Sequence, residues 1–329
     1  MKHYNIPIFI PELACPNRCI YCNQRHISGQ LQAVKPEEIR QIIEQHLATF
    51  IKPSHVELAF FGGSFTGIGE NEMITYLKII QPYIEKGDIK SIRISTRPDY
   101  INKKILDILK SYNVSDIELG AQSLDEEVLS FAKRGHTVKD VENASQLIKD
   151  YGFSLGLQMM IGLPLDSVEK SKKTARKILE LGAKSTRIYP TLVINNTDLA
   201  DLYRAGQYKA LSLEEAVDWA AEIYKIFSQT DITILRVGLH PSEALINGEQ
   251  LLAGPFHVSF KELVLTKLWQ EKLTNIPIDT KTILVNPREI NYAIGYSGAN
   301  RKKLQKKSPF LKFISDSNVQ LGTFVAENQ

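Results

Sequence analysis

Apolar stretches of strand length alternate with amphipathic stretches of helix length through most of the chain. Strands that alternate with helices at intervals of roughly 30 residues indicate βαβ units, which build a parallel sheet. Right-handed crossovers curl such a sheet into a barrel or part of one. We therefore predict an α/β fold with six strand–helix units. The predicted strands are Ile6–Glu12, His55–Phe61, Ser91–Thr96, Asp116–Gly120, Ser154–Ile161 and Ser185–Tyr189.

The three cysteines of the chain, Cys15, Cys19 and Cys22, all fall in one short loop after the first predicted strand. Thiolates suit zinc, Cu(I) and iron–sulfur clusters. A closed zinc site takes four ligands, and an ordinary electron-transfer cluster takes four cysteines. Three cysteines therefore favour a [4Fe–4S] cluster that leaves one iron open for a substrate or cofactor. The alternatives are a zinc site completed by His26, or cysteines that are buried only as small hydrophobic side chains.

The composition is that of a globular protein, with 43% hydrophobic and 23% charged residues. A formal net charge of +3 does not by itself indicate a nucleic-acid partner. No apolar run has the length of a membrane span or the form of a signal peptide, and three clustered cysteines argue against a secreted disulfide framework. We expect a cytoplasmic protein without a membrane segment, and the sequence does not indicate its oligomeric state.

The spacing Cys-x3-Cys-x2-Cys, with Tyr21 just before the last cysteine, resembles the motif of the radical S-adenosylmethionine (SAM) enzymes. This resemblance implies a six-stranded partial barrel, a [4Fe–4S] cluster on the three cysteines, and SAM bound to the open iron. It also implies reductive cleavage of SAM to a 5′-deoxyadenosyl radical, with an electron from a flavodoxin or ferredoxin. Tyr21 would then lie beside the adenine of SAM.

Two further stretches carry the resemblance to a SAM site. Gly62, Gly63 and Ser64 follow the second strand, where radical SAM enzymes present backbone groups to the amino group of SAM. Glycines allow the backbone to approach a ligand closely. Many family members have a glutamate where this chain has Ser64.

The segment Gly120–Val128, together with Lys133–Thr137, resembles the corresponding part of oxygen-independent coproporphyrinogen III oxidases. That resemblance implies that Gln122 and Arg134 hold the SAM carboxylate, and the planar fork of arginine suits this task. Ser95 and Gln158 match positions that contact the SAM ribose, although the relatives have carboxylates there.

The run Tyr189–Ile194, followed by Asn196–Leu199, resembles the radical SAM domain of the Elongator catalytic subunit, which modifies the wobble uridine of transfer RNA. This resemblance implies transfer RNA as a partner. The first two cysteines are closer together here than in that subunit. Roughly 90 residues follow the predicted barrel, which we expect to be too few for its acetyltransferase domain. If the reaction uses acetyl-CoA, another chain must supply it.

We expect a barrel over residues 1–237 and a small α+β extension over residues 238–329 that caps it. His136, His240 and His257 are weak candidates for catalysis or substrate binding, since a lone histidine more often hydrogen-bonds a loop. The basic run Arg301–Lys307 can contact RNA phosphates, but a solvated helix face is the commoner explanation of such a run.

The leading hypothesis is therefore a radical SAM enzyme of the Elongator type that modifies transfer RNA. One alternative keeps the chemistry and takes a small, porphyrin-like substrate. The other is a non-catalytic RNA-binding or scaffold protein that holds a cluster or zinc. The atom attacked, the fate of SAM, and the choice between transferase and oxidoreductase chemistry stay open.

Overall fold

A computed structural model of the chain describes residues 2–10, 19–22, 34–240 and 243–328. Its centre is a sheet of seven strands in which all neighbouring strands are parallel. The predicted α/β partial barrel is confirmed, and β8 adds a seventh strand to the sheet of the six strand–helix units. In spatial order the strands are β1 (Lys2–Ile10), β2 (Ser54–Gly62), β3 (Ser91–Thr96), β4 (Val114–Gln122), β5 (Ser154–Ile161), β6 (Ser185–Pro190) and β8 (Thr233–Val237).

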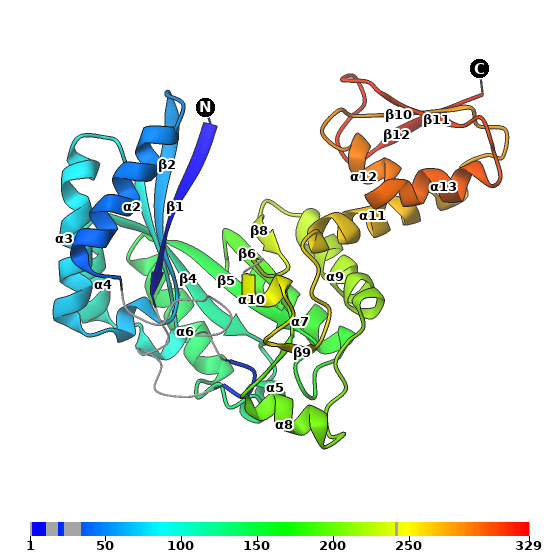
Figure 1. Ribbon diagram of the computed structural model, residues 1–329. Coiled ribbons are helices and arrows are strands. Elements are labelled where there is room, and N and C mark those ends of the chain that lie inside the picture. The colour runs from blue at the N-terminus through cyan, green and yellow to red at the C-terminus, as the bar shows by residue number, and fades with distance from the viewer. Residues whose placement is uncertain (1, 11–18, 23–33, 241–242, 329) are drawn as a thin grey trace.

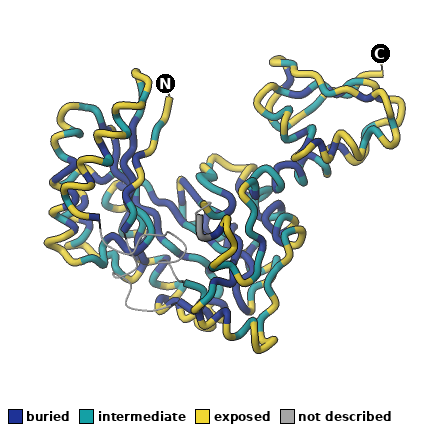
Figure 2. Tube along the Cα trace, viewed as in Figure 1, coloured by how far each residue is buried: buried dark blue, intermediate teal, exposed yellow. Residues whose placement is uncertain are grey.

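Helices cover the outer face of the curled sheet (Figure 1). Their buried side chains pack with alternate strand residues in one large apolar core, which runs as dark blue segments along the strands in Figure 2. Apolar residues at helical spacing explain this arrangement, because such a helix buries only one stripe. The helices are α2 (Pro36–Thr49), α3 (Glu70–Glu85), α4 (Lys103–Ser111), α6 (Val138–Asp150), α7 (Val168–Glu180) and α9 (Leu213–Ser228).

The opposite face of the sheet is polar. Successive strand residues point to opposite faces, so Ile92 and Ile94 join the helix-covered core while Arg93 points to the other side. In the same way Ile117 and Leu119 enter the core, and the buried residue between them is Glu118. The concave face of the half-barrel therefore carries charged and amide side chains.

The part of the cysteine loop that the structure describes is held from outside the sheet. Ile20 donates its N–H to the Ala132 carbonyl over 3.2 Å, and its own carbonyl accepts from Leu199 N over 2.8 Å. These contacts come from the end of α5 (Glu126–Phe131) and from α8 (Asp198–Arg204). Ile20 also belongs to a small apolar cluster with Ala132, Val193 and Leu199. Val193 lies in β7 (Val193–Ile194), which pairs antiparallel with β9 (Leu251–Ala253).

A small α+β unit follows the sheet, as predicted. Its elements are β10 (Thr282–Val285), α12 (Ile290–Ile294), α13 (Ala299–Gln305), β11 (Lys312–Ser315) and β12 (Phe324–Glu327), with β10 in the middle of the three strands. Short helical segments complete the chain at η2 (Phe65–Gly67), η3 (Pro98–Tyr100), α10 (Glu243–Ile246), η4 (Leu273–Asn275) and η5 (Tyr296–Gly298).

Helix α11 (Phe260–Lys272) connects the small unit to the half-barrel (Figure 1). Phe260 and Val264 belong to the core of the half-barrel, whereas Trp269 belongs to a second core with Leu273 and Ile283. The helix is thus shared by both cores, and the division at residue 237 stays a prediction. Among the described residues, no helix has the length and apolar character to span a membrane.

Candidate functional site

The candidate site surrounds Cys19, at the end of the sheet where the carboxyl ends of the strands lie. Cys19 is buried, and its carbonyl accepts the N–H of Cys22 over 3.0 Å. Cys15 and His26 lie outside the described residues. Within the described part of the chain, no three His, Cys, Asp or Glu side chains gather as metal ligands. The predicted three-cysteine site therefore stays a prediction.

Arg134 links the cysteine loop to β4. It is buried, its Nη1 donates to Sγ of Cys19 over 3.1 Å, and its Nη2 donates to the Gly120 carbonyl over 2.7 Å. The Arg134 carbonyl in turn accepts from Nη2 of Arg97 over 2.7 Å. Burial works to lower the pKa of Arg134, but the negative charges that Tyr21 and Cys19 carry when ionised outweigh burial, so its pKa is raised and the guanidinium stays charged.

Gln122 ends β4 with a left-handed backbone, at φ +64°, next to a shift in the register between β4 and β5. Such a conformation is uncommon for a residue with a side chain, and such residues cluster at active sites and ligand contacts. The Gln122 amide nitrogen lies 3.0 Å from where a Cβ on Gly120 would stand, so a side chain at Gly120 would displace it. Gln122 and Arg134, which the sequence predicts to act together, both lie at Gly120.

Buried polar atoms without partners gather around this place. An unpaired buried polar group costs about 1–3 kcal/mol, so several together indicate a ligand that completes them. The donors suit a carboxylate, the Gln122 oxygen suits an amine or hydroxyl, and thiols suit iron–sulfur. The residues present therefore fit a cluster with an amino-acid cofactor. Among the described residues, the unpartnered atoms here are Tyr21 Oη, Arg97 Nη1, Gln122 Oε1, Arg134 Nε and His136 Nδ1.

The glycine turn after β2 packs directly on the end of β1, from which the cysteine loop starts. A Cβ on Gly62, where φ is +107°, would lie 2.4 Å from the Phe9 ring and 2.5 Å from the Ile10 carbonyl oxygen. Gly63 donates its N–H to that same carbonyl over 2.6 Å. Ser64 is buried beside this turn. Only glycine fits at Gly62, because a larger residue would separate the two strand ends.

The concave face carries an ionic network that sequence reasoning missed. Glu118 accepts from Arg187 Nε over 2.7 Å, from Arg93 Nη1 over 3.3 Å and from Gln158 Nε2 over 2.7 Å. Arg93 also donates to Glu57 over 2.9 and 3.0 Å. Burial alone would raise the pKa of Glu118, but Arg187 and Arg93 outweigh it and hold this pKa below its ordinary value. The network joins five strands at one level of the sheet.

Gln158 and Ser95 meet at the edge of this network. Gln158 Nε2 lies 3.4 Å from Ser95 Oγ while it donates to Glu118. The two residues predicted to contact the ribose thus lie together, and Gln158 contacts the carboxylate of Glu118 in β4. A sequence signal for Glu118 exists, since an acidic residue between Ile117 and Leu119 in an apolar strand needs a buried partner.

The three candidate histidines have different neighbours. His136 is buried with Nε2 3.3 Å from the Ala121 carbonyl; burial, and then the charges of Arg134 and Arg97, lower its pKa to about 4. His240 lies 3.4 Å from Arg236 Nη2, and burial with that charge lowers its pKa. His257 accepts from the Ser259 N–H over 3.0 Å. At neutral pH, His136 is therefore an uncharged imidazole.

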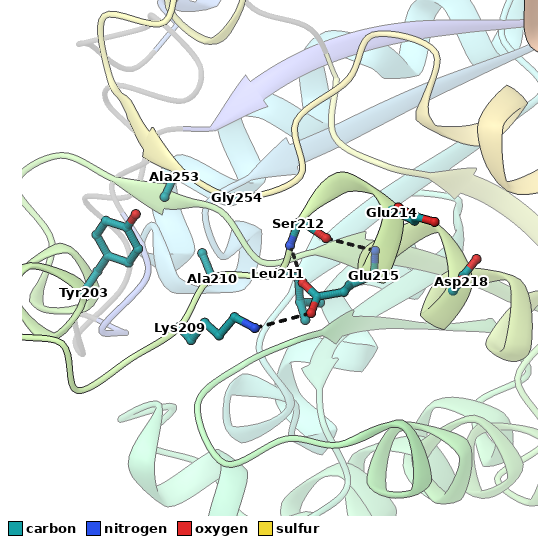
Figure 3. A pocket seen from close by; sticks show the side chains of 10 residues that line it. All are labelled: Tyr203, Lys209, Ala210, Leu211, Ser212, Glu214, Glu215, Asp218, Ala253 and Gly254. Atoms are coloured by element: carbon teal, nitrogen blue, oxygen red, sulfur yellow. Dashed lines mark hydrogen bonds and ion pairs between the residues drawn. The ribbon is translucent and has the colours of Figure 1, made fainter.

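An open pocket of about 790 Å³ lies between α8, β9 and the start of α9 (Figure 3). Its charged side chains are largely paired, because Lys209 contacts Glu215 over 3.5 Å and Asp218 pairs with Lys267 over 2.6 Å. Within the described residues, none of the unpartnered buried atoms belongs to its lining. We therefore place the candidate site at Cys19 and Arg134.

Comparison with known families identifies the superfamily of the chain. The model of the Radical SAM superfamily matches residues 10–178, and the Radical_SAM C-terminal domain matches residues 183–270. The chain belongs to the radical SAM superfamily. This superfamily of enzymes is the one that the cysteine spacing predicts, and a cluster and SAM follow from membership as the expected cofactors.

Curated relatives of this radical SAM chain include the tRNA uridine(34) acetyltransferase of Methanocaldococcus jannaschii, at 38% identity over 128 residues, which is 38% of this chain and 24% of the relative. Human Elongator complex protein 3 is 31% identical over 206 residues, or 56% of this chain and 38% of the relative. The predicted resemblance to Elongator is confirmed. The chain spans only 24% and 38% of the lengths of these two relatives.

Solved structures show the same fold. The N-terminally truncated archaeal Elongator protein 3 of Methanocaldococcus infernus superposes with a TM-score of 0.67 at 23% identity, covering 82% of this chain and 63% of that one. Coproporphyrinogen III oxidase of Escherichia coli gives a TM-score of 0.50 at 19% identity, covering 69% and 52%. At these low identities, the two superpositions show a shared fold and no more.

Proposed function

We propose that this chain is a radical SAM enzyme that modifies transfer RNA at a wobble uridine. In this proposal Cys15, Cys19 and Cys22 hold a [4Fe–4S] cluster, and SAM binds beside it. The observation that carries the proposal is the group of unpartnered buried atoms on Gln122 and Arg134 beside Cys19. The relatives named for transfer RNA uridine acetylation and for Elongator support the choice of substrate.

The residues of the chain bind and orient the cofactor. When bound and reduced, the cluster and SAM would supply a 5′-deoxyadenosyl radical. The two Nη atoms of Arg134 donate to Cys19 and Gly120. Its remaining donor, Nε, holds the SAM carboxylate. Gln122 offers its free oxygen to a donor group of SAM. Burial raises the pKa of the Tyr21 phenol well above its ordinary value, so Tyr21 stays neutral beside the adenine.

The remaining cofactor contacts come from neighbouring strand ends. Gly62, Gly63 and Ser64 present the turn that receives the amino group, and Ser95 with Gln158 receives the ribose. The bond from Gln158 to Glu118 fixes the amide orientation, since Glu118 accepts only. The ionic network beneath these residues keeps the floor of the site rigid.

A positive side chain on β8 favours an anionic substrate such as RNA. Arg236 donates to the carbonyls of Gly238 and Leu239 over 3.0 and 3.1 Å, and no carboxylate among the described residues pairs with it. Burial, together with the charge of Arg187, lowers the pKa of Arg236. A phosphate at this position would neutralise a charge that the described part of the protein leaves uncompensated.

Two further elements belong to the proposal. The reduction of the cluster needs an electron donor, for which a flavodoxin or ferredoxin is suitable. The protein acts in the cytoplasm, where transfer RNA is available.

Anaerobic reconstitution with iron and sulfide tests the cofactor assignment. The wild-type protein should take up iron, show broad visible absorbance, and release 5′-deoxyadenosine from SAM when reduced. The Cys19→Ala variant should lose all three properties. Stoichiometric zinc in a protein that never takes up iron would contradict the proposal, and so would an intact cluster that never cleaves SAM.

The substrate is tested by the modified nucleosides of transfer RNA. We expect a deletion strain to lack one wobble uridine modification, which the wild-type gene restores and the Cys19→Ala gene does not. An unchanged nucleoside profile would remove transfer RNA from the proposal and favour a small-molecule substrate.

A further inference from the structure

The small unit after α11 has an order of elements that the family matches do not cover. The match to the radical SAM C-terminal domain ends at residue 270. Beyond it, β10 leads into α12, a four-residue turn, α13 and β11, and β12 then pairs with β10 from the other side. The unit has its own apolar core, which includes Ile283, Val285 and Ala293. It is therefore a small module that shares α11 with the half-barrel.

The turn between the two helices has the sequence Gly295-Tyr296-Ser297-Gly298. The backbone is left-handed at Ser297 and Gly298, with φ of +51° and +75°, and φ is +85° at Gly295. A Cβ on Gly295 would lie 2.9 Å from Asn300 N and 3.0 Å from Thr266 Cγ2. The backbone conformation therefore favours glycine at both Gly295 and Gly298, and close packing is a second reason at Gly295.

The turn is held in place from below, and its middle faces solvent. Thr266 of α11 accepts the Tyr296 N–H at its hydroxyl over 2.8 Å and the Asn300 side-chain amide at its carbonyl over 3.0 Å. The Tyr296 ring packs edge-on against His257, with ring centres 5.3 Å apart. Tyr296 and Ser297 are both exposed. A fixed, solvent-facing turn is preorganised for a ligand.

Positive charge follows directly after the turn. The Arg301 guanidinium and the Lys302 side chain lie 3.4 and 3.8 Å from where a Cβ on Gly298 would stand. Residues 273–329 contain eight Lys and Arg against four Asp and Glu, a net charge of +4 in a chain whose total is +3. Among the described residues, no carboxylate pairs with the exposed cations Arg301, Lys302, Lys303, Lys306 and Lys307.

We propose that residues 273–328 form a KH-type module that binds single-stranded RNA. In KH modules a GXXG loop between two helices clamps the backbone of about four nucleotides. Here that loop is Gly295–Gly298, and the cations of α13 lie beside it for the same phosphates. A helix face that contacts only solvent would require neither two glycines at this spacing nor a turn that is hydrogen-bonded to α11.

The proposal extends the proposed action on RNA but rests on observations of its own. The module is attached to the half-barrel through α11, which enters both cores. A single-stranded segment bound at Gly295–Gly298 would hold an RNA substrate near the half-barrel at raised effective concentration. The module should therefore affect RNA affinity and not SAM cleavage.

RNA binding by the full-length chain tests the proposal. The probe is a fluorescein-labelled, mixed-sequence single-stranded RNA of about 12 nucleotides, which is longer than the segment that one KH loop clamps. Binding is measured by fluorescence anisotropy at low salt. In the double variant Tyr296→Asp, Ser297→Asp we expect affinity to fall at least about 10-fold, because two carboxylates repel the phosphates. Unchanged affinity would overturn the proposal.

The matched control places the same two charges elsewhere in the module. This control is the double variant Ser317→Asp, Gln320→Asp in the β11–β12 loop, where both residues are exposed. The loop lies away from the Gly295–Gly298 turn, because Gly322 donates to Glu289 at the opposite end of α12. The RNA affinity of this control should stay within about 3-fold of wild type, since a loss of that size can come from long-range charge repulsion alone. Equal losses in both variants would indicate non-specific electrostatics and overturn the KH assignment.

A milder variant keeps the test valid if the double variant unfolds. Lys302→Gln, on the exposed surface, should weaken binding about 3-fold and reduce the salt dependence by about one phosphate contact. An unaltered salt dependence would overturn the proposal. A DNA strand of the same sequence should bind more weakly, and equal binding would overturn the assignment to RNA.

SAM cleavage without RNA separates this inference from the proposed function. The reconstituted double variant should cleave SAM at the wild-type rate. Normal cleavage in a wild-type protein that binds no RNA would refute the module alone. RNA binding that depends on the loop, in a protein that never cleaves SAM, would refute the proposed chemistry alone.

Discussion

Arg134 donates a hydrogen bond to the Cys19 thiol over 3.1 Å, although 115 residues separate the two positions in the chain. The bond places a fixed positive charge beside a sulfur that the family motif assigns to the cluster. The same guanidinium contacts the end of β4 at Gly120. One side chain therefore sets the distance between the cysteine loop and the strand that carries Gln122.

Replacing Arg134 by lysine tests its role in SAM binding. Lysine keeps the charge but loses the planar fork, so it cannot reach Cys19, Gly120 and a carboxylate at once. We expect SAM affinity of the reconstituted protein, measured by calorimetry, to fall at least about 10-fold. The exposed Arg204→Lys should match wild type. Wild-type affinity in Arg134→Lys would show that the carboxylate is held elsewhere.

Glu118→Gln should destabilise the fold strongly. It removes the negative charge that Arg187 and Arg93 share in a buried place, which typically costs about 3–5 kcal/mol when one partner of a buried pair is lost. Urea unfolding measures this loss. The control Glu127→Gln, whose side chain is 67% exposed, should cost less than about 1 kcal/mol. Similar midpoints for the two variants would argue against an essential network.

His136 should make stability depend on pH below neutrality. Its pKa is about 4 in the folded chain, held down by burial and by Arg134 and Arg97, with Asp99 acting in the opposite direction. Because the pKa of His136 is lower in the folded chain than its value of about 6.5 in the unfolded chain, its protonation favours unfolding. The free energy of unfolding should therefore be unaffected by His136 above pH 6.5 and fall by up to roughly 3 kcal/mol as the pH decreases toward 4.

The comparison is between the wild-type chain and His136→Gln, with unfolding free energies from urea titrations at pH 6.5, 5.5 and 4.5. Because glutamine does not titrate, the variant should lose less stability on acidification. Parallel pH curves for the two proteins would mean that other groups cause the dependence.

Gly62→Ala should disturb both stability and cofactor binding. Its Cβ would meet the Phe9 ring and the Ile10 carbonyl, and its φ of +107° is strained for alanine. Gly69→Ala is the matched control, because φ there is +95° but nothing lies within 4 Å. The control should cost about 1–2 kcal/mol from backbone strain alone. Gly62→Ala should cost a further 1–3 kcal/mol or so from overpacking, and a smaller cost than the control would contradict this account.

The order of strands and helices could be predicted from the sequence because each element carries its own periodic pattern. The motif positions also led us to expect Gln122 and Arg134 side by side, as they are at Gly120, whereas their contact with SAM stays a prediction. The ionic network was not, because Arg93 and Arg187 lie 25 and 69 residues from Glu118 and meet it only once the strands pair.

The second core and the helical turn at Gly295–Gly298 were missed for a related reason. In sequence, short helices of five and seven residues show too few turns for a clear period. Their apolar residues form a pattern only together with β10 and α11. The glycines became informative when the structure placed a helix on each side of them.

The sheet begins at β1 and finishes at β8 without these two strands pairing, within the part of the chain that the structure describes. A closed barrel would pair the backbone of its first strand with that of its last. Here one backbone edge of β1 and one of β8 take no part in the sheet, so the strands that the structure describes do not by themselves enclose the concave face.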